Sequence, residues 1–363
     1  MNFGFTDEQL ALAATVRDVL RAHCPPAALR SERRPAWEQL AALGFFGLLA
    51  PPESDGLGLG LADVLPALEE TGRACLPGPV VETAVVAPYL LPDNPKLASG
   101  ALCVAVLPPG QAYAPDADLA DLLLVVRDGG WRLVARESAR ESARESVRLV
   151  ARTGVDPCRP VFEVAFDESE ELGGPAAPAL RRATVATAAQ LIGVARELLA
   201  VTVAYARVRT QFGAAIGSFQ AVKHQLADAA VAVEFAAPLV HRAALSVDRG
   251  AESADRGAES AGRAAGSAGR AAESVERAVG TVERAVGTAD RDVSAAKAAA
   301  GEAAVLAARV ALQVHGAIGY TEELDLRFWL ARAWSLSATY GTTAFHRERL
   351  RAALMAGDLR RWP

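Results

Sequence analysis

The chain lacks the features that mark membrane-spanning, nucleic-acid-binding and disulfide-dependent proteins. Its apolar runs stay far short of the ~20 residues that cross a bilayer, so no membrane partner is expected. A formal net charge of −5 leaves no basic surplus for nucleic acid. The start, MNFGFTDEQL, is acidic and amphipathic, unlike a signal peptide. The cysteines are scattered, without a CxxC pair or histidine partners, so we expect reduced thiols in the cytoplasm and no metal site: Cys24, Cys75, Cys103 and Cys158.

Aromatic residues are also scarce, at 6%, whereas alanine is abundant and inflates the hydrophobic content of 51%. Alanine favours helix over sheet. The length of 363 residues suffices for two or three domains. Apolar residues keep helical spacing near both ends of the chain, but short alternating runs such as DLLLVV and VFEVAF stand between them. We therefore predict a mainly α protein with a helical domain at 1–98, a small β domain at 99–175 and a C-terminal four-helix bundle at 176–363.

Two repeats interrupt this pattern. The first, ARES-ARES-ARES within residues 136–147, interrupts what should be a β-hairpin, and its polarity favours a solvated loop or a helical excursion. In the second, within residues 249–292, arginine recurs at every seventh position. Large apolar residues of a coiled-coil seam are missing there until Val275. We favour a polar low-complexity insertion between two bundle helices, with a partner-binding arm as the alternative.

One stretch, YARVRTQFGAAIGSFQAVKHQLAD from Tyr205 to Asp228, organises the C-terminal half. It indicates the end of a long helix, a turn bracketed by Gly213 and Gly217, and a second helix that Ser218 can cap. An arginine beside a turn, followed by a glutamine, can offer charge and amide hydrogen bonds to a phosphate-bearing ligand. The residues are Arg209 and Gln211.

The string R-x-Q-F-G-x-x-I-x-x-F-Q in this stretch resembles the flavin-contacting signature of the acyl-CoA dehydrogenase family. LQVHGAIGYT resembles the family's Q-x-x-G-G-x-G-[YF], with Ala317 in place of the second glycine, and the glycine-threonine of Tyr340-Gly341-Thr342 resembles the pair that follows the family's catalytic glutamate. The resemblance implies FAD, with the arginine reaching the pyrophosphate of a neighbouring subunit's flavin. The implied cofactor-binding residues are Arg209, Gln211, Phe212, Phe219, Gln220, Gln313, Val314, His315, Gly316, Ala317, Thr342 and Thr343.

The N-terminal half supports the same resemblance, but the β region departs from it. A tryptophan helix, a G-x-x-G-L pair, a proline-glycine loop and an E-E-x-G-R helix end follow in the family's order, at Trp37, Gly44–Leu48, Pro52–Leu59 and Glu69–Arg73. The threonine-glutamate-proline-glycine and tryptophan-threonine motifs that cover the flavin ring are missing from this sequence, and 108–110 is the nearest remnant. The implied fold is acyl-CoA dehydrogenase-like with a reduced β domain.

Ordinary structural roles remain open for the same residues. Arg209 near a helix end can pair with a carboxylate, Phe212 and Phe219 suit a core, and His315 suits the C-terminal end of a helix. The remaining histidines share no spacing suitable for metal. Only the joint spacing of the motifs favours flavin.

The catalytic base is the main departure from the family. Tyr340 stands where the family's glutamate immediately precedes the glycine-threonine pair, and a phenol with a reference pKa of ~10 is a poor base near neutral pH. A second family position, near Ala183 and Thr184, holds no acid either. Weak substitutes follow the glycine motif at Glu322, Glu323 and Asp325, although acids at a helix start are usually surface residues.

Three readings therefore remain for the function. The chain resembles the base-less subunits that pair with a glutamate-bearing homologue, as a hetero-oligomer that shares flavin and desaturates an acyl-CoA or acyl-carrier thioester. It can instead be a self-sufficient dehydrogenase, dimeric or tetrameric, that uses a non-standard acid. The third reading is a flavin-free scaffold or assembly protein that keeps the fold.

Overall fold

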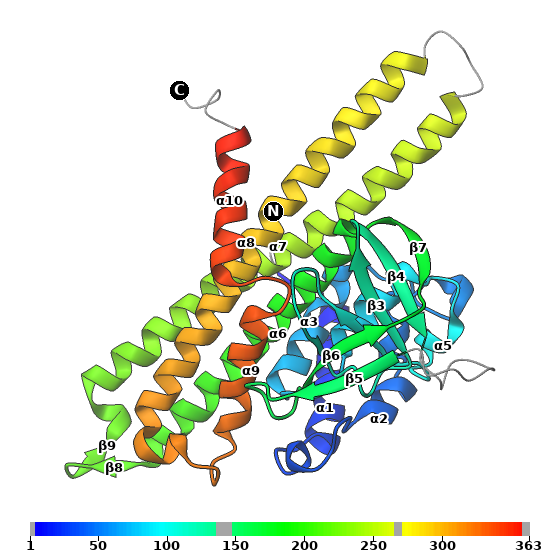
Figure 1. The fold of residues 1–363 in the computed structure, drawn as a ribbon. Coiled ribbons are helices and arrows are strands. Elements are labelled where there is room, and N and C mark those ends of the chain that lie inside the picture. Colours follow the sequence, from blue (N-terminus) through cyan, green and yellow to red (C-terminus); the bar gives the residue numbers. More distant parts are fainter. Residues whose placement is uncertain (1–3, 136–146, 265–270, 358–363) are drawn as a thin grey trace, which may run out of the picture.

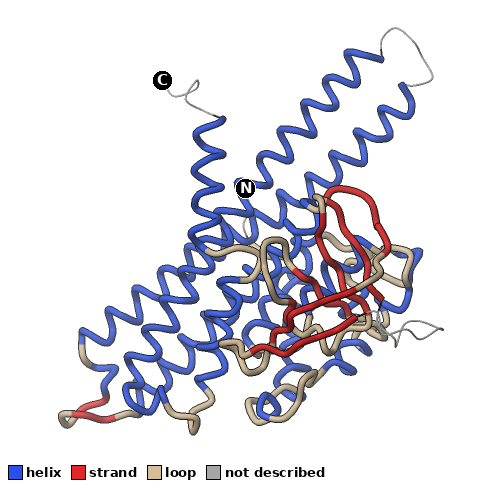
Figure 2. The backbone as a smooth tube through the Cα atoms, viewed as in Figure 1, coloured by secondary structure: helices blue, strands red, loops and turns tan. Residues whose placement is uncertain are grey.

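The structure is a computed structural model that describes residues 4–135, 147–264 and 271–357. Helices make up most of it, and a small region of strands lies against one side of the helical body (Figures 1 and 2). This confirms the predicted mainly α fold with a small β region. The ARES repeat lies outside the described residues.

The N-terminal helices pack on the first helix of the C-terminal bundle. Helix α1 (Asp7–His23) begins with a capping box between Thr6 and Gln9, and α3 (Leu61–Arg73) crosses α6 (Ala177–Val208). At that crossing an added Cβ on Gly72 would come within 2.1 Å of the Gln190 carbonyl oxygen, and one on Gly193 within 1.9 Å of the Glu69 carbonyl oxygen. Only glycine permits so close an approach. Short elements complete this part: η1 (Ala28–Arg30), α2 (Trp37–Ala42), η2 (Phe45–Gly47), η3 (Pro52–Ser54), the π-helical η4 (Glu82–Val86), α4 (Ala87–Leu90) and α5 (Pro95–Ala98).

The β region contains two small sheets rather than one continuous meander. The first has the order β1-β3-β4-β7 and the second β2-β6-β5. The strands on either side of the ARES repeat, β4 and β5, lie in different sheets, so the expected β-hairpin there is wrong. Besides the local pairs β3–β4 and β5–β6, β4 also pairs with β7 and β2 with β6, which an alternation of side chains does not reveal. The strands are β1 (Val104–Leu107), β2 (Ala114–Pro115), β3 (Leu122–Arg127), β4 (Gly130–Ala135), β5 (Val147–Arg152), β6 (Val161–Phe166) and β7 (Glu170–Pro175).

The C-terminal half is a bundle of long helices. Helices α6, α7 (Gln220–Ala264) and α8 (Ala271–His315) run along one another, and α9 (Leu326–Ala338) packs beside them. The last helix, α10 (Thr343–Gly357), is separated from α9 by a sharp loop and projects from the body (Figure 1). Alanine dominates the buried positions of α6 and α8, which lets helix axes approach closely.

The described part of the heptad segment is helical, whereas we expected the two bundle helices to end on either side of a polar insertion. Helices α7 and α8 continue through most of residues 249–292 and form a paired arm beyond the body (Figure 1). Arginine, alanine and glutamate are strong helix formers, so the missing apolar seam does not stop the helix itself. By length and composition alone, Gln220–Ala251 and Val286–Tyr320 also satisfy a membrane-span criterion; these helices belong to the bundle, and the criterion is weak for two core helices.

A two-residue hairpin joins α6 to α7 at one end of the bundle. Strand β8 (Thr210–Gln211) pairs with β9 (Ala214–Ala215), and the turn residues Phe212 and Gly213 have φ of 53° and 77°. A short η6 (Ile216–Ser218) precedes α7. The Ser218 hydroxyl donates to the Ala215 carbonyl instead of capping α7, so the predicted N-cap is wrong. We call residues 209–220 the bundle tip.

Candidate functional site

A well-formed cavity lies where the α9–α10 loop meets α6 and α8. Its volume is about 410 Å³. Tyr340, Gly341 and Thr342 line it, together with residues of the β domain loop at 109–111. The predicted glycine-threonine motif and the remnant of the ring-covering loop therefore face one cavity, as the resemblance implies. Thr343 does not line it, because its hydroxyl lies against Gly301 of α8.

Tyr340 is buried, and its hydroxyl group forms a hydrogen bond inside the protein. Its Oη donates to Glu82 Oε1 at 2.9 Å, and its backbone has φ of 55°. Burial, with the charge of Glu82 and the hydrogen bond to it, raises the pKa of Tyr340 well above its ordinary value. The phenol thus stays protonated and donates a hydrogen bond to Glu82. It cannot take a proton from a ligand as a carboxylate would.

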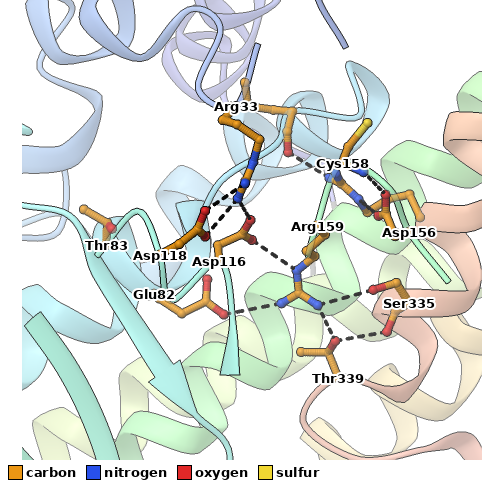
Figure 3. Close-up of polar contacts among 12 residues, drawn as sticks. Arg33, Glu82, Thr83, Asp116, Asp118, Asp156, Cys158, Arg159, Ser335 and Thr339 are labelled. Carbon is orange, nitrogen blue, oxygen red and sulfur yellow. Dashed lines mark hydrogen bonds and ion pairs between the residues drawn. The ribbon is translucent and has the colours of Figure 1, made fainter. Parts of the chain in front are cut away.

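A chain of charged side chains extends from Glu82, the hydrogen-bond partner of Tyr340 (Figure 3). Arg159 lies 3.6 Å from Glu82 and 3.8 Å from Asp116, and it donates to Thr339 Oγ1 at 2.8 Å. Arg33 continues the chain outward to Asp116, at 3.3 Å. Burial raises the pKa of Asp116 to about 7, although the neighbouring arginines oppose the shift. The network fixes the end of α9, directly before Tyr340.

Two further buried side chains hold the α9–α10 loop. The Lys297 ammonium donates to the carbonyl oxygens of Leu336, Ser337 and Gly341, each at 3.1 Å, so all three of its protons have acceptors. His346 Nε2 donates to the Tyr340 carbonyl at 2.9 Å. The unsatisfied carbonyls at the end of α9 thereby gain partners. These contacts make the conformation of Tyr340 rigid.

The bundle tip presents the other predicted flavin residues to solvent. Arg209, Gln211 and Gln220 are exposed, and Phe212 is 93% exposed. Arg209 forms no ion pair with the residues described. The expectation of a core position for Phe212 is wrong, and Phe219 is 37% exposed. A large apolar ring held in water beside a free guanidinium is typical of a binding surface.

The glycine motif after α8 lies at the same end of the bundle. His315 stacks on Tyr205 of α6 with ring centroids 4.3 Å apart, and its Nδ1 bonds to the Ala311 carbonyl. Gln313 and Ala317 are exposed. An added Cβ on Gly316 would meet nothing within 4 Å, so a ligand can approach this backbone. The short η7 (Gly316–Tyr320) follows, and Val314 is half-buried.

The predicted flavin residues therefore form two groups, which lie near opposite ends of helix α6. The bundle tip follows the C-terminal end of α6, whereas Leu180 and Thr184 near its N-terminal end line the cavity. About 25 helical residues separate the two groups, a distance of roughly 40 Å at ~1.5 Å per residue. One FAD cannot touch both groups within the same chain. The tip fits part of a dinucleotide, since it offers a cation, amides and open glycine backbone.

The three substitute acids do not reach the cavity. Glu322 pairs with Arg327 at 3.3 Å and is 90% exposed, and Asp325 pairs with Arg30 at 2.5 Å. Glu323 is also exposed. All three precede α9, whereas Tyr340 follows it, so the 13-residue helix holds them about 20 Å away. They are surface acids at the start of a helix, as the simpler interpretation held.

Sequence reasoning missed the charged residues that surround the cavity. Glu82, Arg159 and Lys297 belong to no motif, and each meets its partners only through the tertiary fold. Their types gave no signal because buried charges look like surface charges in a sequence. The four cysteines are buried free thiols, and burial raises their pKa, for example to about 12 for Cys24.

A helical N-terminal part, two small sheets and a long-helix bundle with glycine motifs at one end form the architecture that the resemblance to flavoprotein dehydrogenases implies. Residues 6–92 match the family model described as acyl-CoA dehydrogenase, N-terminal domain. Residues 176–280 and 267–355 match the model of the acyl-CoA dehydrogenase C-terminal domain. The matches cover more than half of the sequence, and the chain belongs to the acyl-CoA dehydrogenase family. FAD is the cofactor that this membership implies.

Curated and solved relatives agree with this assignment. The acyl-CoA dehydrogenase IpdE2 of Mycobacterium tuberculosis is 33% identical over 250 residues, which are 64% of this chain and 74% of the relative. The ChsE4–ChsE5 complex from the same organism has a TM-score of 0.75 at 21% identity over 99% of this chain and 100% of that chain. A variant of the Tcur3481–Tcur3483 steroid ACAD gives 0.76 at 23% identity, over 97% and 98%. At these identities the solved structures show the fold alone.

Proposed function

We propose that this chain is the base-less subunit of a heteromeric FAD-dependent acyl-CoA dehydrogenase. The observation that carries the proposal is the position of Tyr340, which replaces the expected base and donates its own proton to Glu82. Desaturation of an acyl thioester needs a base for the α-proton. The partner would be a homologue of similar fold with a glutamate before its glycine-threonine pair.

The split between the two groups of flavin residues supports an assembly. In this proposal the bundle tip reaches a FAD held mainly by the companion chain, and Arg209 would contact its pyrophosphate. Bound FAD supplies the hydride acceptor for the β-carbon. The tip's role is to hold the diphosphate and to cover the adenine end with Phe212. Two of the similar solved structures, ChsE4–ChsE5 and Tcur3481–Tcur3483, carry the names of two chains each.

The substrate would be an acyl thioester on CoA or on a carrier protein. The test compares the purified chain alone with the chain co-purified with a glutamate-bearing companion, using acyl-CoA and an artificial electron acceptor. We expect activity only in the pair. Activity of the chain alone that is lost on Glu322→Ala, Glu323→Ala or Asp325→Ala would establish the self-sufficient enzyme instead. If the chain without a companion is active and only Glu82→Gln abolishes that activity, the base would be this buried acid.

A flavin-free scaffold is the outcome if neither preparation binds FAD. A scaffold would show no flavin absorbance, which distinguishes it from the heteromeric and the self-sufficient dehydrogenase before activity is measured. The fold by itself does not decide between these classes.

A further inference from the structure

The mouth of the cavity carries three charged side chains from three helices. Arg181 of α6 donates from Nε and Nη2 to the two carboxylate oxygens of Asp290 of α8, at 2.8 and 3.0 Å. Arg349 of α10 donates to the same carboxylate at 3.0 Å. Two guanidinium groups thus share a single carboxylate. The cluster keeps a net charge of +1.

The wall behind this cluster is apolar. Leu180, Val293 and Phe345 line it, with Ala177 and Ala338 between them. The side chain of Arg181 is only 13% exposed, so its charge lies beside a medium that screens poorly. Although burial acts to raise the pKa of Asp290, hydrogen bonds and charge from Arg181 and Arg349 lower it overall. The carboxylate stays ionised, and the surplus positive charge persists near neutral pH.

We propose that this cavity binds an amphiphilic anion, with its apolar chain against Leu180, Val293 and Phe345 and its anionic oxygens on Arg181 and Arg349. A volume of about 410 Å³ lies within the usual range for small-molecule sites. Guanidinium groups suit both carboxylate and phosphate, since they donate parallel N–H groups to planar or tetrahedral oxyanions. The binding concerns the isolated chain and needs neither FAD nor a companion, so it stands or falls separately from the proposed heteromer.

Asp290 acts in this proposal as an internal competitor for the arginines. A ligand anion must share or displace its contacts, which lowers affinity for every anion. Asp290→Asn keeps the size of the side chain and removes its charge. It strengthens anion binding while leaving neutral ligands unaffected.

Isothermal titration of the purified chain with decanoate, decyl phosphate and decanol tests the proposal. We expect at least one anion to bind about tenfold more tightly than decanol, as one or two charge-assisted hydrogen bonds imply. Arg349→Ala should bring the anion to within about threefold of decanol, while Asp290→Asn should tighten the anion alone. A preference for decanoate indicates a ligand with a free carboxylate, and a preference for decyl phosphate indicates a phosphoryl group.

Arg351→Ala is the matched control, because this neighbouring arginine of α10 pairs with Glu348 outside the cavity. It should leave all three affinities unchanged. Arg349 is half-exposed, so its removal should leave the thermal midpoint close to that of the native chain. Equal binding of decanol and both anions, no binding of any probe, or an anion preference that survives Arg349→Ala would overturn the proposal.

Discussion

Tyr340 donates its phenolic proton to Glu82 across 258 residues of sequence, at an oxygen–oxygen distance of 2.9 Å. The bond joins the loop that bears the family's usual base position to a π-helical turn of the N-terminal part. Arg159 compensates the charge of Glu82 from 3.6 Å. The pair forms a structural contact, and Tyr340 therefore offers no base to the cavity.

Tyr340→Phe should leave the turnover of the companion pair within about twofold of the native value. The same change should lower the free energy of unfolding by about 1–2 kcal/mol, because the buried Glu82 loses a donor. Steady-state kinetics and urea denaturation measure the two effects. Tyr113→Phe, at a site 43% exposed, is the control and should change neither. A hundredfold loss of turnover would make Tyr340 a catalytic group and end the base-less assignment.

Gly193→Ala should destabilise the chain severely, by more than ~3 kcal/mol, because the new methyl would overlap the Glu69 carbonyl oxygen at the α3–α6 crossing. Gly287→Ala in α8 is the matched change, since an added Cβ there meets nothing within 4 Å. It should stabilise by about 0.5–1 kcal/mol through helix propensity. Thermal unfolding of both variants checks the pair. Similar midpoints would show that the crossing is looser than described.

The buried ion pair between Asp156 and Arg332 should be among the most sensitive contacts of the fold. Arg332 Nε lies 2.5 Å from Asp156 Oδ2, and both side chains are almost fully buried. Asp156→Ala leaves the guanidinium without its anion and should cost about 3–5 kcal/mol. Glu348→Ala, which breaks the exposed pair with Arg351, should leave the urea midpoint unchanged. Comparable losses in the two variants would refute this difference.

His346 should make the fold sensitive to mild acid. Burial lowers its pKa to about 4, and its Nδ1 is buried without a hydrogen-bond partner, while Lys297 and Arg349 oppose a further positive charge. Between pH ~4 and ~6.5 this imidazole binds more protons in the unfolded chain than in the folded one. The contribution of His346 to the free energy of unfolding should therefore rise with pH across this window, by about 3 kcal/mol at most, while Asp116, whose pKa burial raises to about 7, contributes in the opposite direction.

Chemical denaturation at several pH values measures this dependence. His346→Gln keeps a donor for the Tyr340 carbonyl but cannot titrate, so the stability of the native chain relative to this variant should rise with pH between ~4 and ~6.5. A variant curve with the same slope would assign the pH dependence to other groups.

The sequence predicted the elements better than their pairing. Helical spacing located α1, α3 and α6, and the double glycine turn located the bundle tip, because these signals are local. The pairing of β4 with β7 and of β2 with β6 depends on partners outside the neighbouring segments. The heptad segment was misjudged because the missing seam excludes a coiled coil without excluding a helix.

The residues of the site were predicted where they form local sequence motifs, and they were missed where only the tertiary fold brings them together. Motif residues were found at both ends of α6, but their separation needed the length and direction of the helices. Glu82 and Lys297 could not be found, since a buried charge is recognised only by the acceptors and donors that the fold brings to it. Phe212 was expected in a core, and the hairpin turn exposes it instead.

In the proposed heteromer, the bundle tip of this chain binds the FAD that the companion chain holds. The most direct test of this claim is the flavin absorbance of the co-purified pair after gel filtration, for native chain, Arg209→Ala and the exposed neighbour Arg207→Ala. We predict yellow protein for the native pair and for Arg207→Ala, and loss of most of the flavin for Arg209→Ala. Native chain that stays colourless with FAD and a glutamate-bearing companion, or full flavin retention by Arg209→Ala, would contradict the account.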